Sequence, residues 1–176
     1  MVTDGARERA LGEHALRDAG LRVTRPRLAV LDAVGLHPHA TTDALIAAAR
    51  TRLPSLSHQA VYDVLRVLTD AGVVRRIQPR GSVARYEARV ADNHHHLVCR
   101  ACGSITDVDC VVGEAPCLLP GASADGSDPV AGYVLEEAEI TFWGLCPACS
   151  AAAQTDAPTP ASRPEQGPAS REAHRD

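Results

Sequence analysis

Apolar residues in the first part of the chain recur with the spacing of α-helices. Residues 6–20 show a loose helical period, and a second apolar run begins after Thr24, which is a plausible N-cap. A third run follows the loop at 37–40, where Thr41 or Thr42 can cap it. The pattern therefore predicts three helices before residue 54.

The stretch 57–71 gives the clearest helical signal. Ser57 is a good N-cap, apolar side chains recur at helical spacing after it, and Gly72 ends the run. Two short β-prone runs follow at 73–77 and 83–87, joined by a Pro/Gly turn. A helix-turn-helix followed by a basic hairpin is typical of a winged helix, and 57–71 would be its recognition helix.

The rest of the chain has the pattern of strands. HHHLVCRACG and SITDVDC predict a hairpin that turns at a Cys-x-x-Cys, and residues 132–146 are a candidate for a long strand. After Cys149 the composition shifts to Ala, Pro, Ser, Gln and Thr without an apolar period, which predicts a disordered tail at 151–176. The expected fold class is α+β.

The charge is distributed unevenly between these two parts. Residues 1–90 carry 14 Arg against 9 acidic residues, whereas residues 91–150 carry 1 Arg against 9 acidic residues. A basic first part indicates that this part meets a polyanion such as DNA. No apolar run is long enough for a transmembrane helix and the start lacks signal-peptide character, so we expect no membrane contact and a cytoplasmic location.

Six cysteines in a cytoplasmic chain are more typical of metal ligands or redox thiols than of structural disulfides. Two Cys-x-x-Cys pairs, Cys99 with Cys102 and Cys146 with Cys149, have the spacing of a tetrahedral zinc site. The alternative is two redox dithiols or a disulfide pair. The remaining Cys110 and Cys117 are either two small buried residues or a redox-responsive pair.

A run of three histidines opens the predicted hairpin. On a strand, His94 and His96 point to one face and His95 to the other, and Asp107 lies across the hairpin from them. Nitrogen and carboxylate ligands together suit Fe(II), Mn(II) or a second Zn(II). The alternative is that the histidines are simply solvated.

Taken together, these segments resemble the ferric uptake regulator family of bacterial metal-dependent repressors. The resemblance covers about residues 10–150, and DVDC and GEAPC are most similar to the branch that regulates catalase-peroxidase. The matching segments are LRVTRPRLAVLDAV, HPHATTDAL, SHQAVYDVLRVL, AGVVRRI, ARYE, NHHHLVCRACG and WGLCPAC.

The resemblance implies a homodimer with three parts per subunit: a winged helix-turn-helix DNA-binding domain at 1–87, a hinge at 88–93 and an α/β dimerisation domain at 94–150. It also implies structural zinc on the four paired cysteines. A second family site would fall on positions that include Ala138, which cannot bind metal; those positions are Asn93, His95, Glu114 and Ala138. The regulatory metal, Fe(II), Mn(II) or a second Zn(II), would bind His37, Glu87, His94, His96 and Asp107.

The expected function is metal-dependent repression, responsive to peroxide and directed at catalase-peroxidase and the chain's own gene. The alternatives are an iron-responsive repressor of iron uptake and a repressor that senses thiol oxidation through Cys110 and Cys117. A zinc hydrolase is disfavoured because four cysteines close the zinc site and no H-x-E motif is present, so we expect no enzyme. Contacts to double-stranded operator DNA are expected from Arg22, Arg25, Arg27, Ser57, His58, Gln59, Tyr62, Arg66, Arg75, Arg76 and Arg80.

Overall fold

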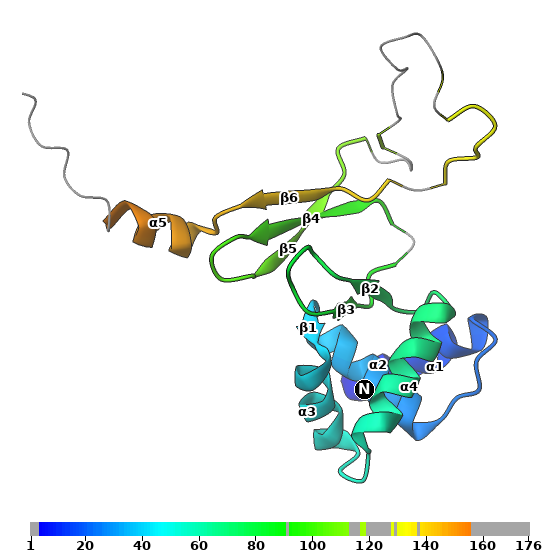
Figure 1. Ribbon diagram of the computed structural model, residues 1–176. Coiled ribbons are helices and arrows are strands. Elements are labelled where there is room, and N and C mark those ends of the chain that lie inside the picture. Colours follow the sequence, from blue (N-terminus) through cyan, green and yellow to red (C-terminus); the bar gives the residue numbers. More distant parts are fainter. Residues whose placement is uncertain are drawn as a thin grey trace, which may run out of the picture.

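The computed structural model describes residues 4–90, 92–112, 117–118, 128, 130–136 and 138–155. Four helices gather at one end of the molecule, a small sheet lies between, and a second sheet with the last helix beside it forms the other end (Figure 1). None of the helices in these residues is long and apolar enough to cross a membrane. The helices are α1 Asp4–Asp18, α2 Arg25–Leu36, α3 Thr42–Arg52, α4 His58–Asp70 and α5 Pro147–Thr155; the strands are β1 Ala40–Thr41, β2 Arg75–Ile77, β3 Arg85–Glu87, β4 His94–Cys99, β5 Ile105–Asp109 and β6 Thr141–Gly144.

The predicted N-caps are confirmed. The side chain of Thr24 accepts a hydrogen bond from the backbone N–H of the third residue of α2, and Thr41 does the same for α3. Ser57 accepts from Ala60 N at 3.1 Å and so fixes the start of α4. Each cap satisfies a backbone donor that the first turn leaves free, which stabilises a helix by about 1 kcal/mol.

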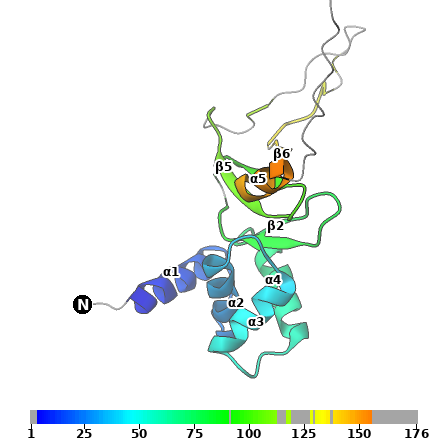
Figure 2. The ribbon, with the colours of Figure 1, turned by 90° about the vertical axis from the view of Figure 1, so that its left-hand side faces the viewer.

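The core lies among the helices. Val61, Leu65 and Leu68 are at most 1% exposed and form the stripe that the sequence predicts for α4. They join buried residues of α2 and α3, including Val34 and Leu45, in one apolar cluster. The face of α4 away from this cluster is therefore free to carry polar side chains. In the view of Figure 2, α1 extends outward from α2, α3 and α4.

The first sheet has the order β1-β3-β2 and is antiparallel throughout. Strands β2 and β3 form the predicted hairpin. Strand β1 was not predicted, because two residues carry no period; it pairs Ala40 with Tyr86 and Thr41 with Arg85. This pairing brings the loop after α2 against the end of β3.

The second sheet has the order β5-β4-β6. Strands β4 and β5 form the predicted hairpin, with His96 opposite Asp107, whereas β6 runs parallel to β4 with Val98 beside Trp143. The long strand predicted for 132–146 is wrong in its extent, because only Thr141–Gly144 is a strand among the described residues. Its earlier half contains consecutive acidic residues, which break the apolar alternation of a half-buried strand.

The end of the described chain also differs from the prediction. Helix α5 continues to Thr155, so a disordered tail beginning at 151 is wrong for its first five residues. The reason is local: Pro147 suits the first helical position, and the alanines at 151–153 have the highest helix propensity. The described residues of 88–93 carry neither helix nor strand, and their role as a hinge stays a prediction.

Candidate metal centres

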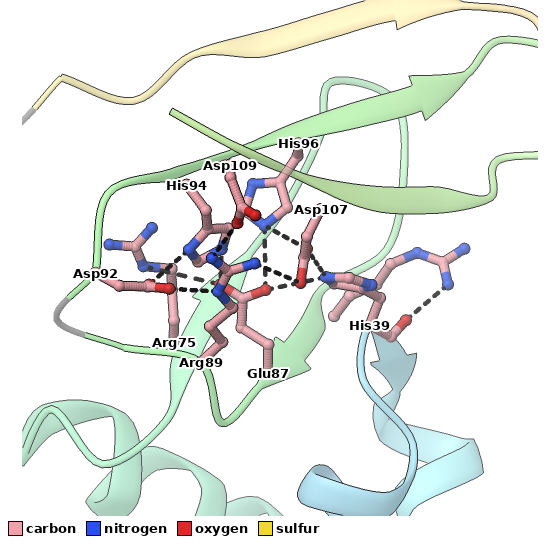
Figure 3. Close-up of polar contacts among 10 residues, drawn as sticks. His39, Arg75, Glu87, Arg89, Asp92, His94, His96, Asp107 and Asp109 are labelled. Carbon is pink, nitrogen blue, oxygen red and sulfur yellow. Dashed lines mark hydrogen bonds and ion pairs between the residues drawn. The ribbon is translucent and has the colours of Figure 1, made fainter. Parts of the chain in front are cut away.

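A buried carboxylate stands at the centre of the polar cluster between the two sheets (Figure 3). The side chain of Glu87, the last residue of β3, is 1% exposed. Its Oε2 lies 3.0 Å from His39 Nε2 and 3.1 Å from His96 Nε2, and its Oε1 lies 3.1 Å from His94 Nε2. Three imidazoles from two sides of the molecule thus converge on one carboxylate.

The second sheet supplies its ligands by strand alternation. His94 and His96 point to the same face of β4, and their ring centroids lie 5.0 Å apart. The antiparallel register puts Asp107 of β5 beside His96, with Asp107 Oδ1 3.7 Å from His96 Nε2. The geometry brings Glu87, His96 and Asp107 together, whereas His94 contacts Glu87 at 3.1 Å but lies outside the group of ligand atoms that are all within 4.8 Å of one another.

The first sheet supplies His39. The backbone N–H of His39 donates to Tyr86 O at 2.9 Å, and Arg85 Nη1 donates to His39 O at 3.0 Å. His39 adopts a φ of 59°, the left-handed region that non-glycine residues seldom occupy. These contacts aim its ring at Glu87 and at Asp107, whose Oδ1 lies 2.8 Å from His39 Nε2.

The family resemblance assigns this position to His37 and gives His39 no role. In the structure His37 is an exposed residue at the C-terminal end of α2, whereas the His39 side chain is 11% exposed. Ligand atoms of His39, Glu87, His96 and Asp107 all lie within 4.8 Å of one another, and His37 is not among them. The cause is the β1–β3 pairing, which places residue 39 rather than 37 beside the end of β3. No periodic signal in the sequence marks this pairing, because β1 has only two residues.

The electrostatics of the cluster favour a charged carboxylate. Burial raises the pKa of Glu87, but hydrogen bonds from His39 and His96 outweigh it and hold that pKa at about 2. The hydrogen bond to Glu87 in turn raises the pKa of His39, and the charge of Asp107 adds to this. Asp107 Oδ1 is buried and accepts no well-formed hydrogen bond among the described residues. Imidazoles, two carboxylates and a poorly satisfied oxygen fit a divalent ion such as Fe(II), Mn(II) or Zn(II).

Outer residues hold this group in place, and sequence reasoning missed them. Asp92 Oδ1 lies 2.7 Å from His94 Nδ1, on the opposite side of the ring from Glu87. Arg89 pairs with Asp92 and also donates to Asp109 Oδ1 at 2.5 Å. A carboxylate on the far nitrogen fixes the tautomer and orientation of a ligating histidine.

The four paired cysteines come together as one cluster. Cys99 ends β4 and Cys102 lies in the following turn, while Cys146 follows β6 and Cys149 is in the first turn of α5. Their Sγ atoms all lie within 4.8 Å of one another, and those of Cys102 and Cys146 are 3.8 Å apart. The parallel pairing of β4 with β6 brings the four cysteines together.

Hydrogen bonds from the backbone N–H groups of Cys102 and Cys146 lower the pKa of Cys99 to about 6. All four thiols are free, and four thiolates at this spacing fit tetrahedral zinc.

The other two cysteines meet the third histidine. Cys117 Sγ lies 3.3 Å from His95 Nε2, and Cys110 Sγ belongs to the same group, within 4.8 Å. His95 was expected in a second family site with Asn93, Glu114 and Ala138. Glu114 lies outside the described residues and Ala138 offers no ligand atom.

The predicted DNA-contacting residues lie mostly on the exposed side of the winged helix. Tyr62 is 49% exposed, and Gln59 and Arg66 on the same helix pair with acidic residues four positions later. Arg75 instead lies toward the metal cluster, with its Nε 3.9 Å from Glu87 Oε1 (Figure 3). Side chains of the remaining predicted residues are exposed or half-buried: Arg22, Arg25, Arg27, Ser57, His58, Arg76 and Arg80.

A winged helix whose hairpin ends in the carboxylate of a histidine-rich metal cluster defines a class of metal-responsive transcriptional regulators. The comparisons agree with this class. Residues 18–112 match the Ferric uptake regulator family. The transcriptional regulator FurA of Mycobacterium bovis is 63% identical over 135 residues, which cover 77% of this chain and 87% of that protein.

More distant relatives show the same relationship. The peroxide-responsive repressor PerR of Staphylococcus aureus is 35% identical over 94 residues, covering 53% of this chain and 63% of that protein. The crystal structure of the Vibrio cholerae ferric uptake regulator, described with rearranged DNA-binding domains, superposes with a TM-score of 0.53 at 27% identity, covering 76% of this chain and 98% of that one. The chain belongs to the Ferric uptake regulator family.

Proposed function

We propose that this chain is a metal-dependent, DNA-binding repressor that peroxide inactivates. One observation carries the proposal: Glu87, at the end of the wing, contacts His94 and His96 of the second sheet while His39 and Asp107 close the same group. An ion held by this group ties the DNA-binding part to the second sheet. Metal that binds only this arrangement shifts the population toward it by its differential affinity.

The exposed face of α4 supports DNA as the partner. Tyr62 and Arg66 project from that face, and Arg76 lies on the neighbouring hairpin. An aromatic ring packs on thymine methyl groups, and arginines neutralise phosphates or contact guanine. The 63% identical relative is a transcriptional regulator, which agrees with this surface.

An uncovered apolar face supports a dimer. Leu97, Val108 and Phe142 occupy neighbouring positions on β4, β5 and β6 and are 38%, 37% and 46% exposed. Joining two copies through this sheet would present two α4 helices to successive major grooves of a palindromic operator.

The ligand chemistry supports sensing of peroxide. When bound, Fe(II) supplies the one-electron reduction of hydrogen peroxide to hydroxide and a hydroxyl radical. His39, His94 and His96 all lie beside the central carboxylate, so their imidazoles are the nearest oxidisable groups. Addition of the hydroxyl radical to one of these rings, with loss of one further electron to the Fe(III) just formed and of one proton, would add one oxygen atom and remove a ligand, and the ion would then no longer hold the DNA-competent arrangement. The relative PerR, a peroxide-responsive repressor, is consistent with this role.

The test is a metal-titrated binding assay on DNA upstream of the chain's own gene. The zinc-loaded protein is titrated with Mn(II), which occupies the Glu87 group without reacting with peroxide. We expect DNA affinity to rise with Mn(II), and to fall again when a chelator removes Mn(II) while the cysteine-held zinc stays in place. Equal DNA affinity before and after that chelation contradicts the proposal.

A further inference from the structure

Strand β4 carries candidate metal ligands on both of its faces. His94 and His96 face the Glu87 cluster, whereas His95 points to the opposite face, where its ring lies edge-on to Phe142 with centroids 6.1 Å apart. His95 is 6% exposed. The function proposed above does not involve this buried imidazole. The groups that contact it therefore indicate its role.

Those partners are two thiols. Ligand atoms of His95, Cys110 and Cys117 all lie within 4.8 Å of one another, and His95 Nε2 is 3.3 Å from Cys117 Sγ. Cys110 directly follows β5, and its backbone N–H donates to Asn93 O at 3.1 Å, which fixes it against the start of β4. Two of the three groups are thus positioned by backbone hydrogen bonds of the sheet. The buried Nδ1 of His95 has no hydrogen-bond partner in the part of the chain that the structure describes, so Nε2 is the nitrogen committed to the thiols.

We propose that His95, Cys110 and Cys117 form a third metal site, which binds Zn(II) through one imidazole and two thiolates. Zn–S and Zn–N bonds of about 2.3 and 2.0 Å place tetrahedral ligand atoms roughly 3.5–3.8 Å apart, so the group needs to contract by at most about 1 Å. Two thiolates balance the charge of the dication, which removes the cost of burying an isolated charge.

The donor set distinguishes this site from the other two. In the part of the chain that the structure describes, its donor set contains no carboxylate, which favours zinc over Fe(II) and Mn(II), unlike the Glu87 cluster. The described residues give it three protein ligands, one fewer than the site of the paired cysteines. The ion would join residue 117 to β4 at the face of the second sheet that carries Phe142. This inference does not depend on DNA binding or peroxide sensing.

Cobalt titration of the reduced full-length protein tests the assignment. Absorption from thiolate-to-cobalt charge transfer reports only the sites that contain cysteine. The Glu87 cluster has no cysteine ligand, so it does not contribute to this absorption. The wild-type protein should show six thiolate ligands, and the double variant Cys110→Ser/Cys117→Ser should show four, with one zinc fewer per chain by mass spectrometry of the metals. Val111→Ser, a fully exposed neighbour, is the matched control and should leave both counts unchanged. Equal zinc and cobalt signals in the double variant and the wild type overturn the proposal.

Alkylation of the wild-type protein tests it without relying on the fold of the double variant. Zinc should slow the reaction of Cys110 and Cys117 with iodoacetamide at least tenfold, and the single variant His95→Gln should lose most of that protection. Equal alkylation rates with and without zinc overturn the proposal, as does a Cys110–Cys117 pair that takes up no zinc after full reduction.

Discussion

The Oε2 atom of Glu87 lies 3.1 Å from Nε2 of His96, so the last residue of the wing touches the second sheet directly. Both side chains are at most 2% exposed. A buried carboxylate is costly unless charge or hydrogen bonds compensate it, and here imidazoles surround it. Under the proposed function, this contact is where an ion bound by the cluster would couple the winged helix to the second sheet.

Replacing Glu87 by Gln keeps the size of the side chain and removes its charge. We expect affinity for Mn(II) to fall by more than the ~10–100-fold that loss of an outer-shell partner causes, because Glu87 contacts three of the other candidate ligands. Competition with a chelator of known affinity measures the change. Glu136→Gln, at an exposed position, is the control. If Glu87→Gln kept the wild-type affinity for Mn(II), Glu87 would not be a ligand of this site.

His39 and His37 offer a matched pair, because they lie two residues apart and only one faces the cluster. His39→Ala should weaken binding of Mn(II) and abolish metal-dependent DNA binding, whereas His37→Ala should behave like the wild type in both assays. The reason is the 3.0 Å contact of His39 with Glu87 and the exposed position of His37. Isothermal titration calorimetry with Mn(II) measures the affinity of both variants. A larger loss of affinity in His37→Ala than in His39→Ala would show that His37 is the ligand.

The difference between these two histidines shows where sequence reasoning reaches its limit. Strand alternation was sufficient to group His94 with His96 and to place Asp107 across the hairpin, because both follow from a period of two. The identity of the histidine from the first part of the chain depends on β1, whose two residues carry no periodic signal. The family resemblance points to His37, whereas the structure brings His39 into the cluster.

The same distinction applies to the fold. The N-caps and the stripe of α4 are local or periodic features, and they were predicted with the correct residues. The parallel pairing of β6 with β4 and the extent of the 132–146 strand depend on contacts between distant segments. Asp92 contacts His94, and Arg89 contacts Asp92. These contacts form in space, and the positions of the two residues in the sequence do not predict them.

Binding of metal should depend on pH through His39. Its pKa is raised, chiefly by the hydrogen bond to Glu87, so below that raised value the ring holds a proton that the metal must displace. Affinity for Mn(II) should therefore rise with pH by up to about tenfold per unit, and level off above the pKa of His39. Glu87 contributes no such slope near neutrality because its pKa is about 2. Titrations between pH 6 and 8 measure the slope, and the same slope in His39→Ala would assign the proton to another group.

Loss of the four-cysteine site should unfold the second sheet before the helices. The buried apolar residues that the structure describes after residue 90 are only Val98 and Cys99, whereas the apolar cluster around α4 lies within 16–86. Cys146→Ser should therefore lose zinc and the β signal in circular dichroism while keeping most of the helical signal. Structural zinc contributes on the order of 10 kcal/mol in small domains, more than this core can replace. Ala148→Ser, exposed on α5, is the control, and one cooperative transition at the wild-type temperature in Cys146→Ser would contradict the role of zinc.

Peroxide should mark the ligands of the Fe(II) form. His39, His94 and His96 all lie within about one hydrogen-bond length of Glu87, so a radical produced in the cluster meets their rings before it can diffuse away. Brief treatment of the Fe(II)-loaded protein with hydrogen peroxide should add the mass of one oxygen atom to a peptide that contains one of them, and DNA affinity should fall in proportion to that modification. The Mn(II)-loaded protein, which holds the same geometry without the reaction, should stay unmodified and bound to DNA. If peroxide released the DNA while the histidine peptides stayed unmodified, this cluster would not be the sensor. The thiols of Cys110 and Cys117 would then be the candidates.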